Sequence, residues 1–145
     1  FLLEDAKDSL NKRIANTFIL EDEGTIVQLL LLNDKISRQE VTNSQWKSIK
    51  DSFPDNKRFR SYPAIKIGRF AVASSYRGRN IGTFLMNMIK DMINSQQNFS
   101  AFRFITVDAY LSATPFYIKN GFTQLTEKDA NEHTRLMFFD MMVLE

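Results

Sequence analysis

The sequence predicts a mixed α/β fold, in which helices flank a central mixed sheet. The chain has 145 residues, of which 43% are hydrophobic and 25% are charged, and this is the size and composition of one compact domain. Strand and helix patterns follow in the order strand, strand, strand, helix, strand, helix, strand, strand. Because this order mixes hairpins with crossovers, it favours a mixed sheet with helices packed against it.

The N-terminal part combines a helix with a hairpin. Apolar residues recur at helical spacing over residues 2–13 and predict an amphipathic helix with a packing role. Two strands, 17–20 and 25–32, flank a turn from Glu21 to Gly24, where glycine suits the tight position. The second strand is almost continuously apolar, so we expect it to be buried on both faces.

Residues 33–62 form the least regular part of the sequence. A helix is predicted over 41–53, with Thr42 or Asn43 as its capping residue. Long loops in small domains are often functional, so we expect substrate recognition in this region.

In the next strand, over 64–73, the apolar residues switch from one face to the other about halfway along. Two isoleucines share one face in its first half, whereas Phe70 and Val72 lie an odd number of residues further on. A bulge near Gly68 would restore the register and would leave backbone N–H groups from Phe70 through Ala71 to Val72 available to a ligand carbonyl. A strand that is buried on both faces needs no bulge, and both explanations stay open.

The turn after this strand predicts an anion site. Glycines let the backbone approach a ligand, and the N-terminus of the following helix offers unpaired N–H groups and a positive dipole end. An ordinary strand-to-helix turn with solvated arginines is the alternative. The residues of the turn are Arg77, Gly78, Arg79, Asn80, Ile81, Gly82 and Thr83.

The net charge of +2 hides a basic window between residues 56 and 90, which has no Asp or Glu and eight Lys or Arg residues. We expect it to attract anions, although a solvated basic face without a partner would give the same pattern. A nucleic-acid-binding module is a further alternative, but no motif of a known RNA- or DNA-binding fold accompanies the window.

The helix that starts near Asn80 is strongly amphipathic, and we expect its apolar residues in the core. They are Ile81, Phe84, Leu85, Met88, Ile89, Met92 and Ile93. The remaining predicted elements are a strand over 102–110, a short helix over 112–120, and two strands over 122–125 and 134–144. Thr114 is the expected N-cap of the short helix, and Gly121 is the residue expected to end it.

Several chemistries are excluded or disfavoured. The absence of cysteine excludes disulfides, thiolate ligands and an acyl-cysteine intermediate, and a single histidine, His133, disfavours a protein-built metal site. We expect His133 to be a surface residue. No apolar run reaches the roughly 20 residues that span a bilayer, and no signal pattern is present, so we expect a cytoplasmic protein.

Two motifs resemble the GNAT superfamily of acyl-CoA-dependent N-acetyltransferases. The run from Arg77 to Gly82 is similar to the family's pyrophosphate loop, Arg/Gln-x-x-Gly-x-Gly/Ala. The run Ala113-x-x-Phe-Tyr-x-x-x-Gly-Phe122 is similar to the family's late helix signature. Either motif alone is a weak signal, but both together, separated by an amphipathic helix and a strand, are strong. The resemblance covers about residues 15–144.

The resemblance implies a GNAT-like fold with a mixed, mostly antiparallel sheet, which lacks the family's first strand. Residues 1–145 would then be a single, N-terminally truncated acetyltransferase domain. Acetyl-CoA would be the co-substrate, and a primary amine would attack it directly within a ternary complex. The backbone of Phe70 to Val72 would hold the thioester carbonyl, and Tyr117 would protonate the departing thiolate. A core tyrosine that only packs the helix is the alternative for Tyr117.

Two positions depart from the family pattern. Asn80 replaces the first loop glycine; asparagine tolerates a left-handed backbone better than most residues but brings a side chain near the phosphates. Ser112 is the substitute candidate for an asparagine that contacts the pantetheine arm in many relatives. No motif fixes a general base: Glu40, Asp108 and a water chain are alternatives, and Asp108 is more readily interpreted as a structural carboxylate.

The Phe-Leu-Leu start of the chain resembles a subgroup that includes bacterial toxins that acetylate aminoacyl-tRNA and are paired with a repressor antitoxin. If tRNA is a partner, Lys57, Arg58 and Arg60 are better candidates for contacting it than the loop arginines. A different class of function is a GNAT-like domain that binds acyl-CoA or a protein without catalysis, which Asn80 favours and Tyr117 disfavours. The acceptor amine and a homodimer stay open.

Overall fold

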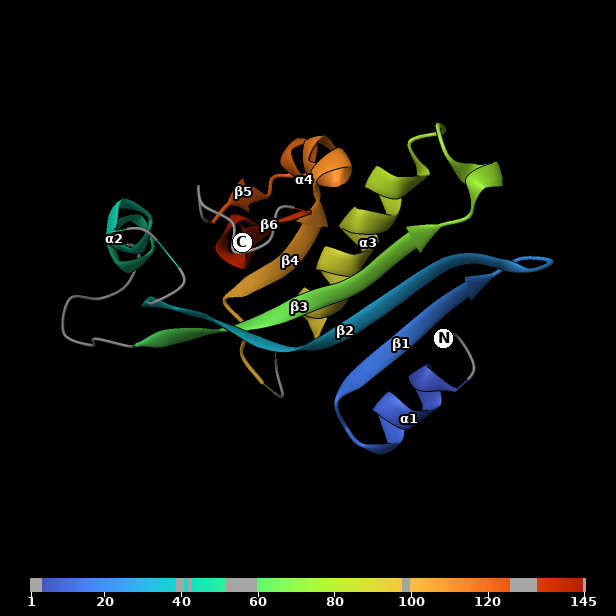
Figure 1. The fold of residues 1–145 in the computed structure, drawn as a ribbon, viewed down its shortest axis with the longest axis horizontal. Helices are drawn as coiled ribbons and strands as arrows, with labels where there is room; N and C mark the ends of the chain where they lie inside the picture. Colours follow the sequence, from blue (N-terminus) through green and yellow to red (C-terminus); the bar gives the residue numbers. More distant parts are fainter. Residues whose placement is uncertain are drawn as a thin grey trace. The chain divides into compact units, whose positions relative to one another are not determined.

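The computed structural model describes residues 4–38, 41, 43–51, 60–97, 100–125 and 133–144. Within these residues it contains a six-stranded sheet of order β1-β2-β3-β4-β6-β5 (Figure 1). The strands are β1 (Ala15–Glu21), β2 (Thr25–Ser37), β3 (Ser61–Val72), β4 (Phe104–Tyr110), β5 (Thr123–Gln124) and β6 (Thr134–Asp140). The helices are α1 (Asp5–Asn11), α2 (Asn43–Asp51), α3 (Ile81–Ser95) and α4 (Thr114–Lys119). The predicted fold class, a mixed and mostly antiparallel sheet flanked by helices, is confirmed.

The chain divides into two compact units. The first unit comprises residues 1–33 and 65–101, and it contains α1, β1, α3 and the adjoining parts of β2 and β3. The second unit comprises residues 34–64 and 102–145, and it contains α2, β4, α4, β5 and β6. Each unit is described separately below.

In the first unit the predicted hairpin is confirmed. β1 and β2 pair antiparallel, from Ala15 opposite Leu32 to Leu20 opposite Val27, and the turn between them contains Gly24 at φ +135°. β2 is buried on both faces from Val27 through Leu29, as predicted. α1 lies beside β1 (Figure 1), in agreement with the expected packing role, although its Leu10 is exposed.

α3 also differs from its prediction. Its buried face is formed by Leu85, Met86, Ile89, Lys90 and Ile93. Phe84 and Met88 are 65% and 50% exposed, although the three-and-four spacing predicts them in the core. Each lies two positions from the fully buried Met86, which is about 160° around a helix of 3.6 residues per turn. The apolar stripe is therefore wider than the face that the protein covers.

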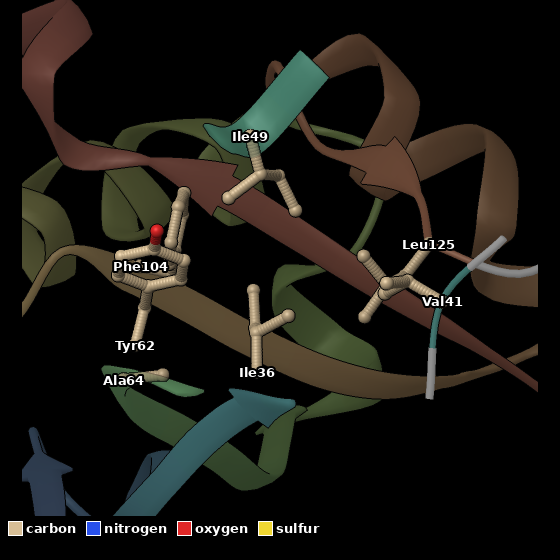
Figure 2. Close-up of a cluster of buried hydrophobic side chains, with 7 residues drawn as sticks. All are labelled: Ile36, Val41, Ile49, Tyr62, Ala64, Phe104 and Leu125. Carbon is tan, nitrogen blue, oxygen red and sulfur yellow. The ribbon is translucent and has the colours of Figure 1, made fainter. Parts of the chain in front are cut away.

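The second unit has an apolar core between α2 and the sheet. Figure 2 shows the cluster, in which the Phe104 ring lies 6.3 Å from the Tyr62 ring; the Phe104 ring also lies 5.7 Å from the Phe138 ring. Trp46 of α2 packs on Tyr62 at 5.4 Å between ring centroids. The buried members of the cluster are Ile36, Val41, Ile49, Tyr62, Ala64, Phe104 and Leu125.

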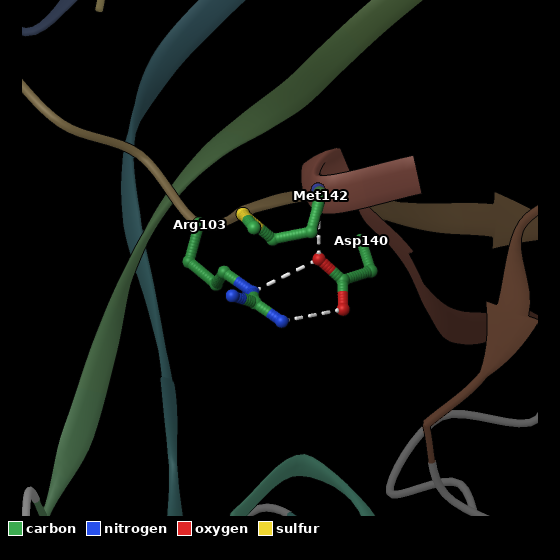
Figure 3. Close-up of polar contacts among 3 residues, drawn as sticks. All are labelled: Arg103, Asp140 and Met142. Atoms are coloured by element: carbon green, nitrogen blue, oxygen red, sulfur yellow. Dashed lines mark hydrogen bonds and ion pairs between the residues drawn. The ribbon is translucent and has the colours of Figure 1, made fainter. Parts of the chain in front are cut away.

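An ion pair joins the residue before β4 to the last residue of β6. Arg103 Nε and Nη2 each lie 2.9 Å from a carboxylate oxygen of Asp140, and Met142 N donates to Asp140 Oδ1 at 3.0 Å (Figure 3). The chain then turns into a 3-10 segment, Met141–Leu144. The predicted last strand, 134–144, is thus too long, because Asp140 ends it by bonding the backbone that follows.

Candidate active site

The predicted anion site lies in the first unit, between β3 and α3. A 3-10 turn, Ser74–Tyr76, follows the strand, and α3 begins at Ile81 with Asn80 as its N-cap residue. Asn80 has φ 55° and ψ 12°, and Gly78 has φ +80°, so the loop is left-handed at both positions. Asn80 thus adopts the left-handed backbone that asparagine tolerates better than most residues. This left-handed conformation turns the chain at the end of the loop, where α3, a helix of 15 residues, begins.

The loop offers charged side chains as well as backbone N–H groups. Arg77, Gly78, Arg79 and Asn80 are all exposed, whereas Ile81 to Thr83 are half-buried in the first turn of α3. Arg77 Nε donates a hydrogen bond to Val72 O at 3.3 Å, which ties the loop to the last residue of β3. Two exposed guanidinium groups beside a helix N-terminus are suited to bind a phosphate group.

Packing supports an irregularity in β3 where the sequence predicts a bulge. A Cβ at Gly68 would lie 2.6 Å from Leu30 Cδ2 and 2.9 Å from Leu32 Cδ2, on the even-numbered face of β2. Phe70 and Val72 pack instead against the cluster of Val27 and Leu85. β2 keeps a regular register against β1 across Val27 to Leu32. The contacts of Gly68 and Phe70 agree with the change of face that a bulge near Gly68 would give.

The basic window is not uniformly available to anions. Lys90 is buried on α3, and this burial lowers the pKa of its ammonium group, while the neighbouring Asp91 raises it. Arg60 and Arg69 are exposed. Lys57 and Arg58, which are candidates for contacting RNA, lie outside the described residues, as does Glu40.

The predicted general acid, Tyr117, lies in the second unit on α4. Its side chain is only 6% exposed, and its ring packs against Phe116 and Phe122 at 5.2 and 5.3 Å between centroids. Burial raises the pKa of the Tyr117 hydroxyl to about 12. The hydroxyl therefore keeps its proton at neutral pH. Within the described part of the chain, it has no hydrogen-bond partner.

A 3-10 turn, Leu111–Ala113, leads from β4 into α4 and carries Ser112, whose side chain is exposed. The predicted N-cap, Thr114, is wrong. Ala113 is the N-cap residue, and the Thr114 hydroxyl instead donates to Tyr110 O at 3.4 Å, because the 3-10 turn already shapes the helix start. Gly121 ends α4 with φ +85°, as predicted.

The remaining candidates from the sequence are exposed. Asp108 is exposed near the end of β4, and His133 is exposed before β6, where its carbonyl accepts a hydrogen bond from Leu111 N. The predicted site residues thus form two groups. The loop and the end of β3 come together in the first unit. Ser112 and Tyr117 lie in the second unit, in the 3-10 turn before α4 and on α4. Among the described helices, none combines the length and apolar character needed to cross a membrane.

Comparison with known proteins agrees with these motifs. Residues 52–144, more than half of the chain, match the family model described as acetyltransferase (GNAT) domain. None of the curated proteins compared with the chain matches it. Among solved structures, a bacterial toxin is similar with a TM-score of 0.80 and 16% identity, over 99% of this chain and 77% of that one.

Two further structures are similar over 99% of this chain. AtaT complexed with acetyl-methionyl-tRNAfMet has a TM-score of 0.77 and 19% identity, with 81% of its chain covered. AtaTR bound with acetyl-CoA has a TM-score of 0.74 and 20% identity, with 80% covered. At these identities the likeness establishes the fold.

Proposed function

The chain belongs to the GNAT acetyltransferase family, and from this premise we propose that it transfers the acetyl group of acetyl-CoA to a primary amine. The observation that carries the proposal is the loop before α3. Its backbone is left-handed at Gly78 and Asn80, and it carries two exposed arginines next to the N-terminus of the helix. Such a loop presents N–H groups and positive charge to a pyrophosphate. We further propose that the two units together form one catalytic domain.

The loop would hold the pyrophosphate of acetyl-CoA through the backbone amides between Arg77 and Thr83. The end of β3, where Phe70 and Val72 are half-buried and Ala71 is exposed, would hold the thioester carbonyl and stabilise its developing negative charge. Ser112, in the exposed turn before α4, would contact the pantetheine arm.

The reaction would be direct. The amine nitrogen attacks the thioester carbon, the C–N bond forms, and the C–S bond breaks with its electron pair moving to sulfur. Tyr117 donates its hydroxyl proton to this thiolate. The chain has no cysteine, so no acyl-cysteine intermediate can form.

A second candidate concerns the acceptor, and it is the amino group of an aminoacyl-tRNA. The fold likeness to AtaT complexed with acetyl-methionyl-tRNAfMet favours it, as does the exposure of Arg60 and Arg69 in the basic window. Contacts between such cations and phosphates release counterions, so tRNA binding should weaken steeply with salt. Binding that is insensitive to salt would argue against this acceptor.

The experiment that tests the proposal is a transfer assay with labelled acetyl-CoA across four acceptor classes: methionyl-tRNA, spermidine, an aminoglycoside and a peptide with a free N-terminus. We expect labelled product and an equal amount of free CoA with at least one class. Tight binding of acetyl-CoA without transfer to any of the four would instead support a domain that binds acyl-CoA but does not catalyse transfer.

A further inference from the structure

α3 carries two large apolar side chains that the protein leaves uncovered. Phe84 is 65% exposed and Met88 is 50% exposed, and they lie four residues apart, which places them next to each other on one side of the helix. Neither belongs to the buried face of α3. Single exposed apolar residues are common on protein surfaces, so the place of Phe84 in the fold decides whether its exposure has a meaning.

Phe84 lies in the first turn of α3, directly after the proposed pyrophosphate loop. Its backbone N–H donates a hydrogen bond to Asn80 O at 3.1 Å, so the two residues lie one helical turn apart on the same side of the helix. Side chains of an α-helix lean toward its N-terminus and cover the preceding turn. The Phe84 ring therefore lies on the side of α3 that begins at the left-handed Asn80.

The other aromatic residues near the loop are engaged in packing. Phe70 of β3 and Tyr76 of the 3-10 turn are half-buried, and both pack against the cluster of Val27 and Leu85. The Phe84 ring, in contrast, has no ring contact within the part of the chain that the structure describes. Of these three rings, Phe84 is the one whose surface is mostly available to a ligand.

The surroundings of Phe84 suit a nucleotide. Arg77 and Arg79 are exposed in the loop, and the N–H groups at the start of α3 lie next to them, which together favour phosphate. An aromatic ring beside a phosphate site can stack on the flat face of a base. Acetyl-CoA contains both groups, because a ribose joins its pyrophosphate to an adenine.

We propose that Phe84 stacks on the adenine of acetyl-CoA and makes the enzyme selective for acyl donors that carry this nucleotide. This inference rests on the proposed acetyl transfer. The loop would hold the pyrophosphate, and the Phe84 ring, one helical turn further along on the side of Asn80, would hold the base. Adenine and the thioester are at opposite ends of the donor. Phe84 therefore sets the affinity for the donor and takes no part in the chemical steps.

The test replaces Phe84 by leucine, which keeps an apolar side chain and removes the aromatic face. We expect Phe84→Leu to bind acetyl-CoA about tenfold more weakly in isothermal titration, and Phe84→Trp to bind it at least as tightly as the wild-type protein. In the transfer assay, the KM for acetyl-CoA should rise in Phe84→Leu by the same factor, while kcat stays unchanged.

A second ligand locates the contact. S-acetyl-4′-phosphopantetheine has the acyl arm and one phosphate but no adenosine, so its Kd should differ by less than about twofold between the wild-type protein and Phe84→Leu. Competition against labelled acetyl-CoA measures this Kd. The matched control is Phe18→Leu, which removes an exposed ring from β1 of the same unit and should leave the Kd of both ligands unchanged.

An unchanged affinity of Phe84→Leu for acetyl-CoA would overturn the proposal. Equal losses for the two ligands would overturn it as well, because they would indicate a disturbed loop, and so would a loss in Phe84→Trp as large as in Phe84→Leu. A wild-type protein that does not bind acetyl-CoA would refute the proposed function and this inference together. Acetyl transfer by the wild-type protein, combined with full acetyl-CoA affinity in Phe84→Leu, would refute the stacking alone.

Discussion

Gly121 lies against the ring of Phe139: a Cβ at this glycine would be 3.2 Å from Phe139 Cε2. Phe139 packs on Phe122, which packs on Tyr117. Gly121, which ends α4, therefore also lets the Phe139 ring approach closely. This ring is part of the aromatic packing around Tyr117, the proposed general acid.

We predict that Gly121→Ala destabilises the protein by about 2–3 kcal/mol, because the methyl group meets Phe139 and the backbone has φ +85°. Urea unfolding measures the change. The matched control is Gly78→Ala, with φ +80° but no atom within 4 Å of a new Cβ, and it should cost only about 1 kcal/mol. Equal losses of stability for the two variants would show that the contact of the new methyl group with Phe139 does not affect the free energy of unfolding.

The left-handed backbone at Asn80 gives a second prediction. Asn80→Gly should retain stability and acetyl-CoA affinity, because glycine adopts φ 55° without strain. Asn80→Val should lose about 1–2 kcal/mol of stability and bind acetyl-CoA at least tenfold more weakly, because a branched side chain opposes this conformation. Isothermal titration of acetyl-CoA compares the two variants. Equal affinities would contradict a role for this backbone in binding.

Local patterns predicted much of the fold. The hairpin, the doubly buried β2 and the helix stop at Gly121 each follow from a signal carried by neighbouring residues. At Asn80, the place of the residue in the loop motif indicated only that a left-handed backbone would be tolerated there, and the structure has this backbone. In β3, the parity of the apolar residues along the strand narrowed the prediction to two alternatives, a bulge near Gly68 or burial on both faces.

Tertiary contacts decided the features that the sequence could not predict. Phe84 and Met88 have the spacing of core residues, but the width of the covered face, not the helical period, decides which apolar residues are buried. The end of β6 depends on Asp140, which bonds Arg103 37 positions away along the chain.

The ion pair between Arg103 and Asp140 should contribute measurably to stability. Their side chains are 16% and 30% exposed, and both oxygens of Asp140 are engaged. We expect Asp140→Asn to cost about 1–3 kcal/mol in urea unfolding, because it leaves the arginine without its counter-charge. The control is Asp8→Asn, which breaks an exposed pair with Lys12 and should cost about 0.5 kcal/mol or less. A similarly small loss of stability in both variants would contradict a stabilising role for the Arg103–Asp140 ion pair.

The raised pKa of Tyr117 predicts a pH dependence of stability. The tyrosine ionises near pH 10 in the unfolded chain but near 12 in the folded protein, so the folded state holds the extra proton between these values. The free energy of unfolding should therefore be unaffected below pH 10 and fall as the pH rises from 10 to 12, by up to roughly 3 kcal/mol. Urea unfolding at pH 9, 10.5 and 11.5 measures it. Because Tyr117→Phe cannot ionise, that variant should show a smaller decline, and identical slopes would contradict the burial argument.

The most direct test of the account is the rate of label transfer from acetyl-CoA to the amine in Tyr117→Phe. We expect kcat to fall by about 100-fold or more while acetyl-CoA binds as tightly as to the wild-type enzyme, because only the proton donor is lost. Tyr62→Phe, a change at a buried tyrosine of the core cluster, should leave kcat unchanged. Full turnover by Tyr117→Phe would contradict the account.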